Sequence, residues 1–395
     1  MDRRGWRIVP GLGILGSLGL WGAAVAQPEP YVRTSLTLSG VQDSNLFSAT
    51  GDSRQSDSLS RLSPEIEGGF RSARVSVAGR YALDAERFAD HPELDTNRAR
   101  QIATLDFQAR PAHPLSLSLH GDYVSTLMPG ELNLTTGLLA GRQRATRLSV
   151  GPAVDWRLGP ATNATASFTQ TRDDVVSGVA VETRTTALGL KRRLSLRSTG
   201  SLGYTLGRYD FGGENVTTAH ILSLGWERRV GSLGEFTLRG GPRYSEGRID
   251  PEVSLVLRRD AKRLHVSLTC GRSLATVIGR VGTVVTDSIL PAVSWQALRS
   301  LQVSAAPGVF RTRDASGGPE ARVYLIDLGA TWRIGDWLSI AGTYRRSLQQ
   351  GALGGAGSGG AIADIARDTL MLSLVARQGE MRAPAGAGPS QEVAP

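Results

Sequence analysis

The chain has 395 residues, a formal net charge of +9 and a single cysteine, Cys270. One cysteine excludes an intramolecular disulfide, and with it a small secreted fold held together by disulfides. A basic chain can bind nucleic acid, but here the 45 Lys and Arg are spread over the whole length rather than clustered, so we expect no nucleic-acid partner.

The N-terminal residues have the layout of a secretory signal peptide. Arg3, Arg4 and Arg7 precede an uncharged apolar run over 11–26, which closes on Ala24-Val25-Ala26. That run is shorter than the roughly 20 residues that span a bilayer. We therefore expect a signal peptide over 1–26, and the mature chain should be an exported protein.

The mature chain shows polar and apolar residues in strict alternation, which is typical of strands with one apolar and one polar face. Leu148, Val150, Val154 and Trp156 fall on even positions, between polar residues on odd ones. No second apolar run is long enough for a membrane-spanning helix, so an exported soluble protein and a β-barrel remain. The pattern predicts about 18 strands, near 31–43, 58–71, 73–86, 99–110, 115–126, 145–158, 161–172, 182–193, 199–210, 218–229, 234–245, 251–260, 263–274, 287–297, 301–312, 321–334, 337–348 and 367–378.

The predicted connections alternate between short and long, with one exception at Glu246 to Asp250, where a long connection is due. Such alternation is typical of outer-membrane barrels, which have tight periplasmic turns and long outer loops. We therefore predict an all-β protein of the bacterial outer membrane. A single antiparallel transmembrane β-barrel should cover 27–378, followed by a disordered periplasmic tail over 379–395.

The aromatic residues support this layout, because they gather toward the two ends of the predicted strands, where membrane interfaces favour them. The tryptophans expected at the periplasmic ends are Trp156, Trp226, Trp295, Trp332 and Trp337. The residues expected toward the outer ends are Phe47, Tyr81, Tyr123, Tyr209, Tyr244, Phe310 and Tyr344.

The first strand leads into Val41-Gln-Asp-Ser-Asn-Leu-Phe47. This segment resembles the opening signature of the outer-membrane β-barrel porin family called type 2, although Ser44 stands where the family favours an acidic residue. The resemblance implies a single-chain outer-membrane barrel and an association with exopolysaccharide export, with periplasmic export proteins as partners.

No residue pattern in the chain predicts catalysis, and we expect no enzyme activity, metal or cofactor. His265 and Ser267 share a strand face, the pairing that a serine nucleophile needs, but that face should point into the lumen. His91 lies among Asp90, Glu93 and Asp95 without the spacing of a calcium loop. The glycine-rich segment 351–360 lacks the ending of a phosphate-binding loop.

The candidate functional residues are cationic side chains on the polar strand faces, which should line the lumen. They are Arg74, Arg80, Arg147, Arg157, Arg239, Arg243, Arg333 and Arg345. Two explanations stay open: a ladder of ion pairs that stiffens the wall, or a cationic lumen that favours anions. We expect a pore for hydrophilic cargo, such as an anionic solute or exopolysaccharide. The alternative is a structural or plugged barrel without transport.

Overall fold

The computed structural model describes residues 29–213, 215–351, 353 and 364–382. It contains 18 antiparallel strands and three 3-10 turns, η1 (Gly51–Ser53), η2 (Pro92–Leu94) and η3 (Pro129–Leu132). The strands are β1 (Glu29–Asp43), β2 (Asp57–Arg71), β3 (Val75–Phe88), β4 (Thr96–Ala112), β5 (Leu115–Thr126), β6 (Ala145–Arg157), β7 (Thr162–Val175), β8 (Val181–Arg193), β9 (Ser198–Phe211), β10 (Asn215–Val230), β11 (Gly234–Ser245), β12 (Arg248–Asp260), β13 (Leu264–Thr276), β14 (Thr283–Gln296), β15 (Leu301–Asp314), β16 (Glu320–Arg333), β17 (Leu338–Gln350) and β18 (Ile365–Arg382).

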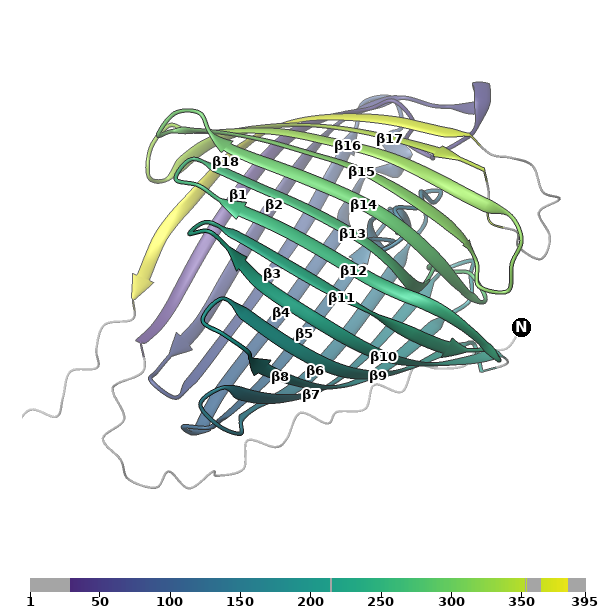
Figure 1. Cartoon of the computed structure of the whole chain (residues 1–395). Helices are drawn as coiled ribbons and strands as arrows, with labels where there is room; N and C mark the ends of the chain where they lie inside the picture. The colour runs from purple at the N-terminus through teal and green to yellow at the C-terminus, as the bar shows by residue number, and fades with distance from the viewer. Residues whose placement is uncertain (1–28, 214, 352, 354–363, 383–395) are drawn as a thin grey trace, which may run out of the picture.

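The sheet closes on itself, as the first and last strands pair side by side in Figure 1. Each strand pairs with its neighbours in sequence, and β1 pairs with β18 from Tyr31–Arg382 to Asp43–Thr369. A closed barrel leaves no strand edge, so the backbone hydrogen bonds of every strand are satisfied within the sheet. Among the described residues no helix is long and apolar enough to cross a membrane.

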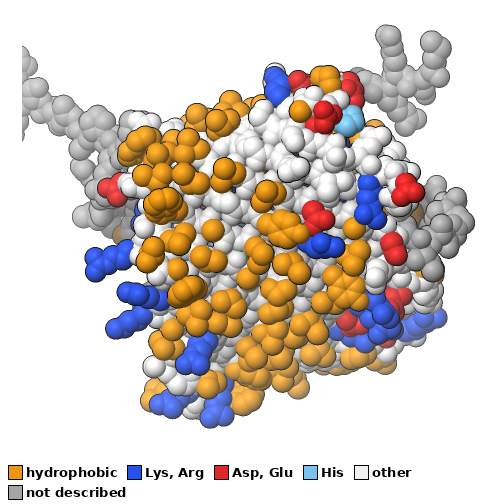
Figure 2. All heavy atoms as spheres, turned by 90° about the horizontal axis from the view of Figure 1, so that it is seen from above, with side chains coloured by type: hydrophobic (Ala, Val, Ile, Leu, Met, Phe, Trp, Pro, Cys, Tyr) orange, Lys and Arg blue, Asp and Glu red, His pale blue; other side chains and the backbone are white. Residues whose placement is uncertain are grey.

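The face of the barrel in Figure 2 is covered mainly by apolar side chains, with charged side chains gathered toward its two ends. Leu148, Val150, Val154 and Trp156 of β6 are each more than a third exposed, which in water would be an unusual number of exposed large apolar groups. An apolar band on a closed antiparallel barrel is the architecture of bacterial outer-membrane proteins. The chain is therefore an 18-stranded barrel of the bacterial outer membrane.

The predicted fold class and strand number are confirmed, and strand bounds differ by a few residues. The largest extensions are toward the long connections, for example β14, which begins at Thr283 instead of 287. β18 continues to Arg382, four residues into the segment expected to be a tail. The predicted signal peptide and the remainder of the tail, 383–395, lie outside the described residues, as does most of the glycine-rich segment 351–360.

The aromatic residues follow the prediction at one end only. The five tryptophans predicted there are at least 41% exposed at the periplasmic ends of the wall. Toward the outer ends, Tyr81 and Tyr244 are also exposed, but Tyr209 and Phe310 are buried and Phe47 packs in an internal cluster. The expected outer girdle was wrong for these three residues, because they face the lumen and contact segments folded into it.

The segment that resembles a family signature fastens the seam between β1 and β18. Arg367 of β18 donates from Nε to Asp43 Oδ2 at 3.0 Å. Asn45 is completely buried, and its side-chain nitrogen donates to the carbonyls of Ala49 and Ala366 at 2.8 and 2.9 Å. These contacts give the motif a structural role in closing the barrel.

Substitutions on β6 test which face meets lipid. Val150 is 42% exposed on the apolar face, so Val150→Arg should lower stability by about 2–4 kcal/mol, the cost of an arginine near the bilayer midplane. Ser149→Arg, which places the same charge inside the barrel, should cost far less. The readout is the fraction of heat-modifiable barrel on a gel, and equal losses in both variants would contradict the facing.

Cysteine labelling tests the orientation. In a Cys270→Ser background, Glu93→Cys, in the exposed connection between β3 and β4, should react with an impermeant maleimide on intact cells. Arg197→Cys, in the β8–β9 turn, should react only after the outer membrane is broken. Labelling of position 197 alone on intact cells would reverse the topology.

Candidate functional site in the barrel lumen

The connection between β5 and β6, residues 127–144, folds into the lumen and reaches the opposite wall; we call it the crossing loop. Nine of the 18 strand positions separate β6 from β15, yet a Cβ built on Gly137 would lie 2.6 Å from the Phe310 ring of β15. The backbone nitrogen of Leu139 donates to Gln349 Oε1 of β17 at 2.9 Å. Leu138 packs in a buried cluster with Phe310 and Val284.

The tip of the β13–β14 hairpin, residues 273–286, also folds inward; we call it the inward hairpin. Leu274 and Val285 are on its outer face but are buried against the lumen-facing Val181 and Phe211 of β8 and β9. Ile278 donates its backbone N–H to Asn133 Oδ1 of the crossing loop at 3.1 Å. The crossing loop and the inward hairpin thus meet inside the extracellular half of the barrel.

The short connection noted in the sequence leaves space for this hairpin. β11 and β12 are joined by Glu246 and Gly247, both with positive φ (51° and 76°), as in a tight two-residue hairpin turn. Pairing between β12 and β13 ends at Val253–Arg272, so β13 is free of β12 beyond that point. The hairpin bends inward there, while β12 stays paired with β11 as far as Ser245–Arg248.

Arg243 of β11 lies beneath the inward hairpin and is completely buried. Its Nη2 lies 3.3 Å from Asp250 Oδ2 and its Nη1 lies 3.5 Å from Glu252 Oε2. A buried guanidinium requires such partners, because an unpaired charge in the interior is strongly unfavourable. Arg243 is on the lumen side of its strand but does not meet solvent, so it holds the fold rather than contacting cargo.

Three more of the eight candidate arginines are ion-paired across neighbouring strands. Arg147 of β6 makes a two-pronged pair with Asp173 at 2.7 Å for each contact and donates to the crossing-loop carbonyl of Leu132 at 2.9 Å. Arg80 pairs with Glu65 at 2.6 Å, and Arg345 pairs with Asp327. These arginines fit the ion-pair ladder, and Arg147 also anchors the crossing loop.

The remaining four candidates, Arg74, Arg157, Arg239 and Arg333, are exposed, and no carboxylate of the described chain lies within 4.0 Å of them. Arg239 is at mid-strand in β11, beside a hollow of ≈ 320 Å³ that Arg258 and Glu227 also line. The other three are at the periplasmic end of the barrel. The two explanations therefore apply to different arginines: ion pairs at one set and free positive charge at the other.

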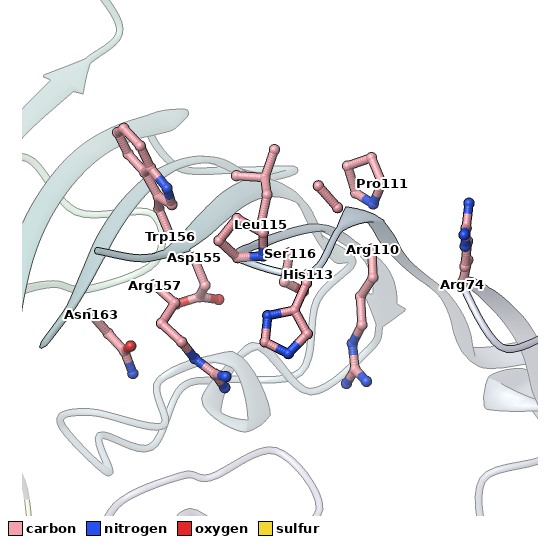
Figure 3. A pocket seen from close by; sticks show the side chains of 12 residues that line it. Arg74, Arg110, Pro111, His113, Leu115, Ser116, Asp155, Trp156, Arg157 and Asn163 are labelled. Atoms are coloured by element: carbon pink, nitrogen blue, oxygen red, sulfur yellow. The ribbon is translucent and has the colours of Figure 1, made fainter. Parts of the chain in front are cut away.

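A hollow of ≈ 580 Å³ opens at the periplasmic ends of β3 to β7. Figure 3 shows Arg110, His113 and Arg157 pointing to one side of the wall, while Trp156 and Leu115 point to the other. Asp155 and Asn163 also line this hollow. Its lining is mixed: Pro111, Pro114 and Leu115 lie beside Arg74, Arg110 and Arg157, and the arginines outnumber the one carboxylate, Asp155.

The two histidines weighed for catalysis and metal binding, His265 and His91, each have a carboxylate partner. His265 Nδ1 lies 2.8 Å from Asp260 Oδ1 rather than on Ser267, and His91 Nδ1 lies 2.8 Å from Asp57 Oδ2. Within the described ranges, no group of three His, Cys, Asp or Glu side chains is arranged to hold a metal ion. Each of these two histidines is thus held by a neighbouring carboxylate on the lumen side or in a loop.

Comparisons with known proteins give only distant structural likenesses. No family model and no curated protein matches the chain. The Pseudomonas aeruginosa OpdO structure has 13% identity, covers 89% of this chain and 98% of its own, and has a TM-score of 0.49. The Acinetobacter baumannii OccAB4 structure has 9% identity, the same two coverages and a TM-score of 0.47. Such scores support no inference about function, and the family resemblance noted in the sequence remains a resemblance.

The crossing loop can be tested without any transport assay. Asn133 is 4% exposed and holds both Ile278 and, through its side-chain nitrogen, the Leu138 carbonyl. Asn133→Ala should remove about 1–3 kcal/mol of local stability, which raises hydrogen–deuterium exchange over 129–139 by about 5- to 150-fold.

Gln302→Ala is the matched control. It removes a side-chain contact of similar length, 2.7 Å to Ser294, on the lumen side of β15 but at its other end. Exchange in 129–139 should stay at the wild-type rate in this variant. If both variants, or neither, accelerate exchange, the loop is not held by Asn133.

Proposed function

We propose that the barrel is an outer-membrane conduit for hydrophilic anions, entered from the periplasm through a cationic lumen and narrowed near the cell surface. The main support for this proposal is that the lumen arginines fall into two groups. Those beside the crossing loop and the inward hairpin are ion-paired or buried, whereas Arg239 and those closer to the periplasm are exposed and unpaired.

The unpaired arginines favour anions because none of them has a carboxylate of the described chain within 4.0 Å, although Glu227 and Glu235 line the same hollow as Arg239. An arginine with a carboxylate partner contributes little net potential, but an unpaired one attracts anions over the screening distance, about 8 Å at physiological salt. Arg239, at mid-strand and unpaired, is therefore the candidate with the largest expected influence on ion selectivity.

More specifically, we propose exopolysaccharide as the anionic cargo. This proposal rests on the resemblance of residues 41–47 to the type 2 barrel family. A polymer would need the crossing loop and the inward hairpin to move aside during passage. The alternative is a plugged or structural barrel, favoured by the apolar contacts that these two segments make with the wall.

Charge reversal at Arg239 tests ion selectivity. In a planar bilayer with a salt gradient, the wild-type barrel should show a reversal potential on the anion-selective side. Arg239→Glu should move that potential toward cations and leave the heat-modifiable barrel unchanged, because Arg239 has no ion pair to lose. Wild-type cation preference would contradict the cationic lumen, and a complete absence of conductance would favour the plugged alternative.

The matched control is Arg192→Glu. Arg192 is an exposed residue at the periplasmic end of β8. It lies opposite Gly200 of β9, and its side chain is on the outward face of the strand. This variant makes the same change in net charge outside the lumen. It should leave the reversal potential where it is in the wild type.

A further inference from the structure

The periplasmic mouth has an arginine at the inner face of almost every strand that ends there. The nine even-numbered strands run toward the periplasm. Eight of them carry an inward-facing arginine near their periplasmic end, and β14 has Gln296 at that place. We call this set the mouth ring. Its members are Arg71, Arg110, Arg157, Arg193, Arg229, Arg258, Arg333 and Arg377.

The mouth ring is exposed and carries more positive charge than the described carboxylates around it. All eight arginines are exposed, and within the described chain none lies within 4.0 Å of a carboxylate. Arg33, Arg74 and Lys191 add positive charge at the same end. The described inward carboxylates there are fewer: Glu67, Asp155, Glu227, Glu235 and Asp260. Glu67 pairs with Arg33 at 3.6 Å, and Glu235 is the ladder neighbour of Arg229 and Arg258. Like charges held close together without partners are unfavourable for folding alone, which points to a ligand that compensates them.

The spacing of the ring suits a chain better than a small ion. Its members recur on every second strand, and neighbouring strands are about 4.8 Å apart, so cationic groups follow each other about every 10 Å around the wall. A small anion can contact one of these groups at a time. A linear polyanion lying along the wall contacts several at once, and such linked contacts raise the affinity without new chemistry.

A second set of arginines faces outward, so lipid binding can be assigned to that set rather than to the mouth ring. Arg192, Arg228 and Arg259 each neighbour a ring member in sequence and are on the opposite, outward face of β8, β10 and β12. Arg228 lies over the Trp226 ring at 5.7 Å from its centroid, at the membrane interface. The outward set is placed to meet anionic lipid headgroups, which leaves the inward ring to a ligand inside the mouth.

We propose that the mouth ring captures a linear polyanion, a chain of carboxylated sugars, as it arrives from the periplasm. This inference rests on the proposed conduit and names its cargo class. The recognition is electrostatic: guanidinium groups donate to successive carboxylates, and the affinity falls steeply with salt because several ion pairs are screened together.

Binding is measured by fluorescence anisotropy, with a labelled oligogalacturonate of about ten sugars added to the whole barrel in nanodiscs of zwitterionic lipid. The test variant is Arg193→Gln/Arg229→Gln/Arg258→Gln. It should weaken binding by about tenfold, as expected for three lost exposed ion pairs. The control, Arg192→Gln/Arg228→Gln/Arg259→Gln, removes the same charge from the outward face and should bind within about twofold of the wild type.

The outcomes separate capture from conduction. Oligomer binding that exceeds monomeric galacturonate at equal carboxylate concentration, and that depends on the inward set, supports capture even if the bilayer shows no conductance. An anion-selective pore that binds oligomer and monomer equally overturns capture and leaves the conduit standing. Loss of binding in the outward control, with the inward variant unaffected, assigns the arginines to a lipid or protein surface and also overturns the proposal.

Discussion

Closure of the β-sheet is the constraint from which the rest of this structure follows. In lipid each strand must satisfy its backbone hydrogen bonds within the sheet, so β1 has to meet β18 and one face of every strand has to be apolar. Charged residues of the strands are then confined to the lumen or to the two ends. The seam contacts of Asp43 and Asn45 with β18 complete this closure at the extracellular end. The arginines on the inner face must either find partners there or remain hydrated.

The inner-face arginines meet this requirement in different ways at the two ends of the barrel. Toward the cell surface the crossing loop and the inward hairpin remove water, and the arginines near them are paired, as Arg147 is with Asp173 and Arg243 is with Glu252. Toward the periplasm no such segment covers the wall within the described residues, and Arg157, Arg239 and Arg333 remain in solvent. The result is a cup with a cationic opening to the periplasm and a filled extracellular half. This polarity supports a role in receiving anions from the periplasmic side.

Strand alternation made the barrel predictable from sequence, because the side that faces lipid must be apolar at every second residue. The same period could not show what lies inside. Tyr209 and Phe310 were expected in the outer girdle from their places near the strand ends alone, although both have the parity of lumen residues. Parity itself does not distinguish a hydrated wall from one packed against a loop. The signal for the crossing loop was its composition: Leu127, Leu132, Leu134, Leu138 and Leu139 are unusual in a connection meant for water. Contacts such as Leu139 with Gln349 join residues 210 apart, and no local pattern encodes them.

The most direct measurement is a cross-link between the crossing loop and the opposite wall. In a Cys270→Ser background, cysteines replace Gly137 and Phe310; a Cβ at 137 would lie 3.2 Å from Phe310 Cγ, close to the reach of a disulfide. The control pair has its cysteines at Gly137 and at Thr331, which is on the inner face of β16 near the periplasm. The 137–310 pair should be oxidised in nearly all folded barrels of intact cells, detected as a linked peptide by mass spectrometry, and the control pair should not. If both thiols at 137 and 310 instead react with an impermeant maleimide from outside, the loop lies in solvent and the filled extracellular half is wrong.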